Sequence, residues 1–201
     1  MAGILKVDTV QADNIQTKSG TSVISSGIPQ RSGSIIEHIS SPCDGSTVVG
    51  ISGSYTFGNV TTYQTDSYSY IDINGSSITY TPPVGTTRVI YQFEWTCYWQ
   101  SAHAITHNKF YLDGVEVLYA RFSRSGYYQE NRTSFTWTIN IGGTPNTNTG
   151  RIATWTTPKI MKMQYRSYGG SDITYLHGTQ YWDGNSGNQF SMPHLTIMAL
   201  A

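Results

Sequence analysis

Charged side chains are scarce in this sequence of 201 residues. Lys and Arg together number 12, Asp and Glu also number 12, and charged residues make up 12% of the chain, about half the usual ~25%. A nucleic-acid-binding domain normally carries a basic patch, and an acidic tail carries a block of negative charge. Neither is present, so we expect no nucleic-acid partner and expect Ser, Thr, Asn and Gly to keep the chain soluble.

Long apolar runs and cysteines are also few. No run approaches the ~18 consecutive apolar residues that a membrane span requires, and residues 1–30 lack the basic and then apolar pattern of a secretory signal. We therefore expect a chain that is made in the cytosol and does not insert into a membrane. Cys43 and Cys97 are the only cysteines; they could pair, but free thiols are the expected state in that compartment.

Catalytic signatures are missing as well. There is no Gly-x-Ser-x-Gly, no phosphate loop and no Gly-x-Gly-x-x-Gly, and no pair of carboxylates stands out for glycan cleavage. His103 and His107 have the spacing of a metal pair on a helix, but we expect a loop here. Asp183, Asn185 and Asn188 could supply oxygen ligands to calcium, but a plain turn is favoured because carboxylates are too few. The sequence thus predicts no enzyme, no cofactor and no metal.

Alternation of apolar and polar residues is abundant. In residues 88–99, "RVIYQFEWTCYW", every second side chain is apolar, which is typical of a half-buried strand. Residues 134–141 repeat the pattern. Asp113-Gly114 fits a two-residue hairpin turn with positive φ at both positions, so Leu112 should face Val115. Weaker alternation predicts strands at residues 33–40, 46–52, 67–74, 76–82, 158–167, 173–182 and 193–201.

Short strands separated by turn signals indicate an all-β sandwich or barrel. The last predicted strand is unusual, because Leu195 and Ile197 lie on one face while Met198 and Leu200 lie on the other. A strand that is apolar on both faces is buried on both. The 15 Tyr residues suit contact surfaces, since Tyr joins an apolar ring to a polar tip. We therefore expect Met198 and Leu200 to meet a neighbouring subunit.

Residues 1–33 differ from the rest. They are rich in polar and small residues, with a few apolar ones early in the segment: Ile4, Leu5, Val7, Val10 and Ile15. So few apolar side chains cannot build a core. The sequence therefore predicts an N-terminal arm and linker at 1–33, followed by one β domain at 34–201.

Both ends of the chain resemble one family. "ILKVDTVQADNI" near the start resembles the N-terminal arm of small fibre proteins of tailed bacteriophages, especially those of marine bacteria, and the remainder resembles their C-terminal knob. "GSIIEHIS" looks like the opening strand of that knob, and "PHLTIMALA" looks like the closing strand. The knob is similar to the trimeric jelly-roll β-sandwich of the complement-globular and tumour-necrosis-factor type.

The resemblance implies a structural protein on the surface of the phage particle, made in the bacterial host cytoplasm and acting as a homotrimer. Ile4, Leu5, Val7 and Val10 would dock residues 1–15 onto another virion protein, the alternative being a disordered tail. The loop before the last predicted strand, residues 181–190, would face away from the virion, and we call it the far loop. It would contact host surface glycan through Tyr181, Trp182, Asp183, Asn185, Asn188 and Gln189, unless Trp182 packs back onto the sandwich. A head or tail decoration protein without receptor binding, and a polysaccharide-degrading enzyme, are the alternatives.

Overall fold

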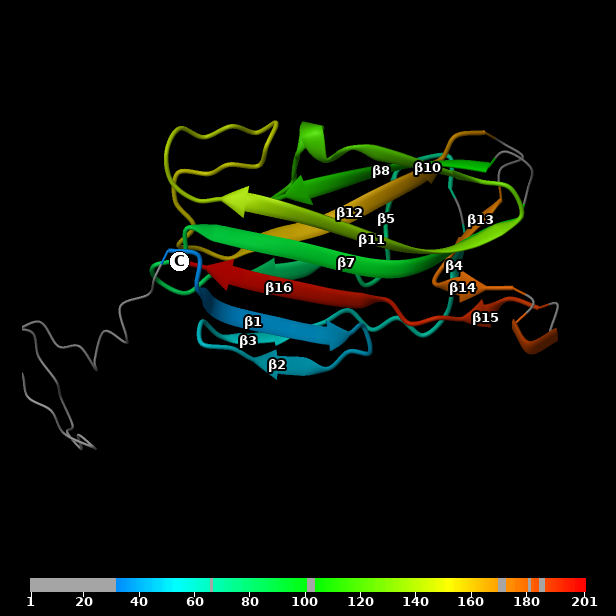
Figure 1. Cartoon of the computed structure of the whole chain (residues 1–201), viewed down its shortest axis with the longest axis horizontal. Helices are drawn as coiled ribbons and strands as arrows, with labels where there is room; N and C mark the ends of the chain where they lie inside the picture. The colour runs from blue at the N-terminus through cyan, green and yellow to red at the C-terminus, as the bar shows by residue number, and fades with distance from the viewer. Residues whose placement is uncertain (1–31, 66, 101–103, 170–172, 181, 185–186) are drawn as a thin grey trace, which may run out of the picture.

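Almost every regular element of the chain is a β-strand. The computed structural model describes residues 32–201 except 66, 101–103, 170–172, 181 and 185–186 (Figure 1). In that part of the chain the strands are β1 Ile35–Pro42, β2 Thr47–Val49, β3 Ser54–Thr56, β4 Gln64–Thr65, β5 Ile71–Asp72, β6 Ile78–Tyr80, β7 Arg88–Trp99, β8 Ala104–Leu112, β9 Val115–Glu116, β10 Phe122–Gly126, β11 Gln129–Asn140, β12 Lys159–Ser167, β13 Thr174–Leu176, β14 Gly178–Thr179, β15 Gln189–Phe190 and β16 His194–Leu200. Two 3₁₀ turns, η1 Leu118–Ala120 and η2 Trp182–Gly184, join them. The predicted arm lies almost wholly outside the described residues.

Strand β7 has the bounds that its alternation predicts. Its odd-numbered side chains, from Val89 to Trp99, are buried, while its even-numbered side chains from Ile90 to Thr96 are half-buried. The first sheet is built around it. β11 pairs with β7 along its whole length, and on the other side β16 and β13 pair with successive parts of β7. β1 pairs with β16, and β4 pairs with β13.

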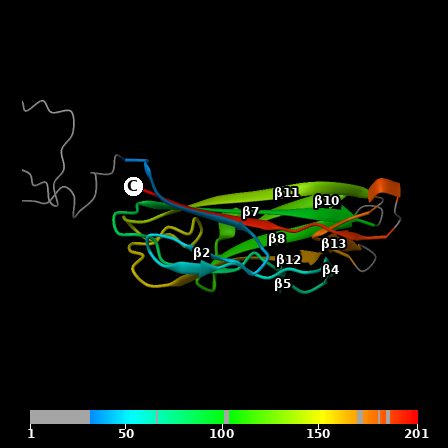
Figure 2. The ribbon, with the colours of Figure 1, turned by 90° about the horizontal axis from the view of Figure 1, so that it is seen from below.

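The second sheet has β8 and β12 at its centre. β10 and β9 pair with one side of β8, and β5 and β6 pair with the far side of β12. Figure 2 shows the two sheets as two layers. Their inner faces meet in the core, where the ring centroids of Tyr91 and Phe110 lie 4.9 Å apart. The chain is therefore an all-β sandwich, as the sequence predicts.

The Asp113-Gly114 turn forms as predicted. The φ angles are 54° at Asp113 and 79° at Gly114, and Leu112 pairs with Val115. The expectation of a loop around His107 is wrong, because β8 begins at Ala104 and includes this residue. The alternate side chains Ala104, Thr106 and Asn108 are buried, as in a strand with one face toward the core. Because they are small or polar, the spacing of apolar residues in the sequence does not indicate this inward face.

The predicted strand at 173–182 is interrupted. His177 has φ 60°, and β13 ends before it while β14 begins after it. An L-residue with positive φ cannot continue a regular strand. The region predicted at 67–74 likewise forms only the two residues of β5, Ile71–Asp72.

Both ends of the described domain lie at one end of the sandwich. The N–H of Gly33 donates to the carbonyl of Ala201 over 2.7 Å, and the N–H of Ala201 donates to the carbonyl of Ser34 over 2.9 Å. We call this the termini end. Figure 1 shows η2, β14 and β15 at the opposite end, which we call the far end.

Candidate functional site

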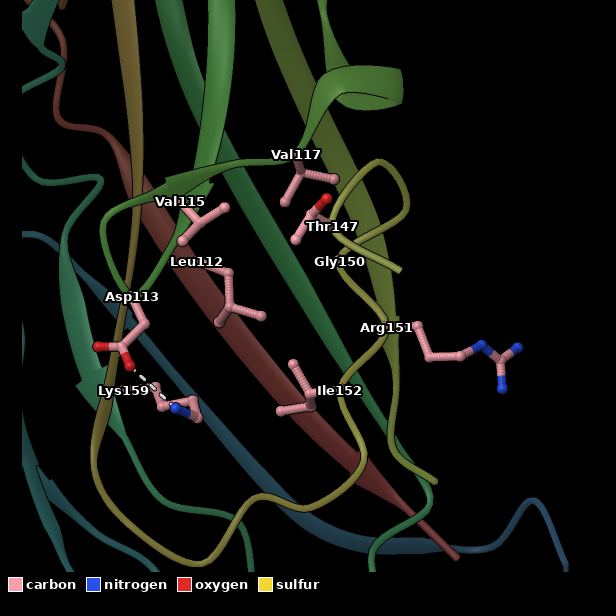
Figure 3. Close-up of a pocket in the computed structure, with 9 residues that line it drawn as sticks. All are labelled: Leu112, Asp113, Val115, Val117, Thr147, Gly150, Arg151, Ile152 and Lys159. Atoms are coloured by element: carbon pink, nitrogen blue, oxygen red, sulfur yellow. Dashed lines mark hydrogen bonds and ion pairs between the residues drawn. The ribbon is translucent and has the colours of Figure 1, made fainter. Parts of the chain in front are cut away.

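An apolar pocket lies where β8 ends and β12 begins (Figure 3). The hairpin that follows β8 carries Leu112, Val115 and Val117 on one wall, and Ile152 lines the opposite side from the loop after β11. The cavity measures about 170 Å³. This is smaller than the ~300 Å³ or more of a typical pocket for a small molecule, so its size suits one inserted side chain.

The charged groups of this pocket offer no evident chemistry. Lys159 Nζ lies 2.8 Å from Asp113 Oδ2, so the two charges pair with each other, and Figure 3 shows Arg151 pointing away from the cavity. The lining contains one carboxylate and neither a cysteine nor a histidine. Sequence reasoning identified the hairpin but not the pocket, because the opposite wall comes from a loop without a periodic pattern.

A second candidate is the outward face of the first sheet, formed by the outward side chains of β1, β16, β7 and β11. Met198 and Leu200 lie half-buried on this face, as the spacing predicts, while Leu195 and Ile197 are buried in the core. Met198 pairs in register with Ile90 of β7. Together they make an apolar strip in a sheet surface whose other side chains are mainly polar, with His38 of β1 in register with Met198.

One carboxylate on this outward face is paired within it. Glu94 accepts hydrogen bonds from Gln92 Nε2 and Arg132 Nη2, both at 2.9 Å. The hydroxyls of Ser40 and Thr196 lie 2.7 Å apart across β1 and β16. A surface with a paired carboxylate and a central apolar strip suits contact with another protein better than it suits catalysis.

The loop between β14 and β16 occupies the far end, as expected (Figure 1). Trp182 is 70% exposed, so the alternative that it packs back onto the sandwich is wrong. Asp183 is exposed with φ 50°, while Asn188 and Gln189 are half-buried. Gln189 pairs with Thr179 in a two-stranded ribbon.

Some predicted site residues cannot be placed. Tyr181 and Asn185 of the far loop lie outside the described residues, as do Ile4, Leu5, Val7 and Val10 of the arm.

Several titratable groups are buried away from these surfaces. Cys43 and Cys97 are both buried and unpaired, as expected. Burial raises the pKa of each thiol to about 12. Burial also lowers the pKa of His177 to about 4, so this side chain is neutral inside the protein at pH 7. Sequence reasoning did not anticipate a buried histidine between two short strands.

Glu37 is a buried carboxylate that sequence reasoning also missed. It accepts hydrogen bonds from Tyr80 Oη at 2.6 Å, Ser52 N–H at 2.9 Å and Ser52 Oγ at 2.8 Å. A Cβ on Gly50 would come within 2.5 Å of a Glu37 oxygen, which accounts for glycine there. The carboxylate therefore joins the β2–β3 hairpin to β1 and β6, and its role is structural.

Within the described ranges, no three His, Cys, Asp or Glu side chains gather as a metal site would require. No helix in that same part of the chain is long and apolar enough to cross a bilayer.

Comparisons with known proteins identify no family. No protein-family model matches the chain, and no curated protein does. Among solved structures, a chain of the infectious bursal disease virus Gx strain matches 95% of this chain and 40% of its own length, with 13% identity and a TM-score of 0.37. A chain of the Gt strain matches 96% of this chain and 43% of its own, with 12% identity and a TM-score of 0.38. This chain thus spans less than half of those viral chains, and likenesses so distant carry no argument about function.

Proposed function

We propose that the chain is a structural virion protein of a tailed bacteriophage, a trimeric fibre knob that docks through its N-terminal arm and contacts host surface glycan with its far end. The observation that carries this proposal is the strip formed by Met198 and Ile90. An apolar strip at the middle of a sheet, flanked mainly by uncharged polar side chains, matches the depletion of charge typical of the core of a protein interface.

The order of the strands supports the jelly-roll part of the proposal. Taking the eight main strands in chain order as β1, β6, β7, β8, β10, β11, β12 and β16, the first sheet reads 1-8-3-6 and the second reads 2-7-4-5. Successive main strands thus alternate between the two sheets, except that β8 and β10 are neighbours in the second sheet, as in two linked Greek keys.

The arrangement of the two ends supports the division between docking and recognition. Ser32, where the described domain begins, is at the termini end, so the preceding arm leaves from there. The exposed Trp182 lies at the other end (Figure 1). A knob that is attached at one end presents the other to its surroundings, and an exposed indole ring can stack on a sugar.

The oligomeric state tests the proposal directly. Light scattering on the full chain should give the mass of three chains, and Met198→Asp should give a monomer, because an unpaired charge buried at an interface costs several kcal/mol. Ile160→Asp is the matched control: it makes the same kind of change at an exposed position of β12 on the other sheet, and it should leave the mass unchanged. A parent protein that is a monomer at micromolar concentration would refute the trimer.

Host contact is tested separately. Trp182→Ala should weaken adsorption of particles to host cells without reducing incorporation of the protein, whereas deletion of residues 1–15 should abolish incorporation and leave the trimer folded. If Trp182→Ala particles adsorb as well as the parent, the decoration role without receptor binding is favoured. Release of reducing sugar from host polysaccharide would instead favour the enzyme.

A further inference from the structure

The outward face of the second sheet carries a cluster of cationic and aromatic side chains that the proposed function does not use. We name it the basic–aromatic cluster; its members are Tyr70, His107, Lys109, Arg121, Arg166 and Tyr168. They come from β8, from β12 and the residue after it, and from the segments that precede β5 and β10. The sequence places them far apart, and the pairing of β8 with β12 and β10 brings them together.

Tyr70 holds two cations close to each other. Lys109 Nζ lies 4.0 Å from the centroid of its ring, and Arg166 Cζ lies 5.5 Å from the same centroid. Both distances are within the range of cation–π attraction. The distance between Lys109 Nζ and Arg166 Cζ therefore cannot exceed the sum of these two distances. The two cations are held near each other although their charges repel.

Positive charge exceeds negative charge in the cluster. Glu116 is the one carboxylate in contact with it among the described residues, and it accepts from both Lys109, at 3.1 Å, and Arg121. One carboxylate thus pairs with two cations, and Arg166 adds a third cation to the cluster. Counted over the described residues, the site has a local excess of positive charge in a chain whose formal net charge is zero.

Two side-chain nitrogens in the cluster have no hydrogen-bond partner among the described residues. His107 and Arg166 are partners in register across β8 and β12. His107 Nε2 and Arg166 Nε are both buried and have no hydrogen-bond partner in the described part of the chain. Buried polar groups without partners are uncommon in native proteins and call for an explanation. An anionic ligand that turns these two side chains toward it on binding would supply one.

A hollow and an exposed aromatic ring both adjoin His107. The hollow measures about 220 Å³, and Tyr70, His107 and Arg121 contribute to its lining. The ring of Tyr168 lies 5.6 Å from that of His107 and is 63% exposed. It therefore offers a free apolar surface beside the positive charge.

We infer that the basic–aromatic cluster binds an acidic saccharide. A carboxylate or sulfate group of one sugar unit enters the hollow, which His107 and Arg121 line. It accepts hydrogen bonds from these two residues and from the guanidinium of Arg166, which lies against Tyr70 at the side of the hollow, while Tyr168 stacks against the sugar ring. Arginine suits both anions because its planar fork matches them in geometry. This site is separate from the far loop, and it holds whether or not the chain belongs to a virion.

Titration calorimetry on the full chain tests the inference at low salt. The probes are tetragalacturonate, which carries carboxylates, a chondroitin sulfate tetrasaccharide, and maltotetraose as the neutral control. Binding of either acidic probe, with no heat from maltotetraose, is expected. The preferred acidic probe then identifies which anion the site takes. Absence of binding by both acidic probes would overturn the inference.

Two substitutions distinguish binding at a specific site from non-specific attraction of anions to the surface. Arg166→Gln should weaken binding by about tenfold or more, the usual effect of losing one charge-assisted hydrogen bond. Lys162→Gln is the matched control, because Lys162 lies on the same strand and the same face but pairs with Asp72 at 2.9 Å. It should change affinity less than twofold.

Equal weakening by the two substitutions would overturn the site in favour of non-specific electrostatics. Tyr70→Phe keeps the ring that holds the two cations and should bind like the parent, so a large loss in this variant would also contradict the argument. Inorganic sulfate that binds as tightly as the acidic saccharides would contradict the role of Tyr168. Thermal unfolding of each variant should remain cooperative, which excludes misfolding as the cause of a loss.

Discussion

His177 should make the stability of this protein depend on pH. Its side chain is fully buried, and its ring packs almost perpendicular to that of Phe93 at a centroid distance of 6.4 Å. Its backbone also joins the far end to β7, since its N–H donates to Thr96 and its carbonyl accepts from Ser191. Protonation of this histidine in place would bury a charge in the apolar interior, which is strongly unfavourable.

The sign and size of the effect follow from the pKa. Burial lowers the pKa of His177 from 6.5 to about 4 in the folded protein. The stabilisation is therefore fully present above pH 6.5, where the residue is neutral in both states. It is lost as the pH falls from 6.5 towards 4, because only the unfolded chain then takes up the proton. A difference of this size corresponds to roughly 3 kcal/mol of unfolding free energy.

Urea unfolding of the parent and of His177→Asn at pH 7 and at pH 4 measures this contribution. Asn is chosen because it tolerates the positive φ of this position and does not titrate. All other ionisable groups are shared, so they cancel when the two proteins are compared. The unfolding free energy of the parent should fall by about 3 kcal/mol more than that of the variant between the two pH values. Equal losses in both proteins would refute the reasoning.

Three further substitutions or assays follow from the packing. Gly126→Ala should destabilise the fold by about 1–3 kcal/mol in thermal or urea unfolding. The reason is that the new Cβ would lie 2.4 Å from a ring atom of buried Trp99. An unchanged unfolding midpoint would contradict this close packing. Tyr80→Phe should lower the unfolding free energy by about 1–3 kcal/mol, because Glu37 would lose its 2.6 Å hydrogen bond while staying buried. A loss of unfolding free energy no greater than that of a surface Tyr→Phe control would show that this bond is unimportant. Both thiols should resist a thiol reagent in the native protein at pH 8 and react fully in denaturant without reductant, because burial holds their pKa at about 12; no reactive thiol in denaturant would mean a disulfide.

The sequence predicts best where one face of a strand is continuously apolar. Strand β7 was predicted with its bounds, because its odd-numbered residues are large and apolar and its even-numbered residues are mostly polar. The hairpin after β8 was equally predictable, since Asp113 and Gly114 both adopt the positive φ that their types tolerate. In both cases the local chemistry and the tertiary environment require the same structure.

Prediction from the sequence was poorer where burial involves polar residues. The inward face of β8 carries Thr106 and Asn108, so its first half does not look like a buried strand. The basic–aromatic cluster was also missed. Tyr70 and Arg166 are almost a hundred positions apart, and they meet only because β5 and β8 flank β12. Contacts of this kind depend on topology, which spacing along the chain does not reveal.

The position of the two chain ends determines how the domain bears mechanical force. β1 and β16 are antiparallel neighbours, and the first residues of β1 pair with the last residues of β16 at the termini end. A pull between Ser32 and Ala201 would peel these strands apart one hydrogen bond at a time, beginning at Gly33. A pull between Ser32 and the far loop would instead draw β1 and β16 lengthwise in opposite directions, so that all the bonds between them share the load. A domain held by its N-terminal side and pulled at its far end would thus resist in shear, the direction in which a pair of strands is strongest.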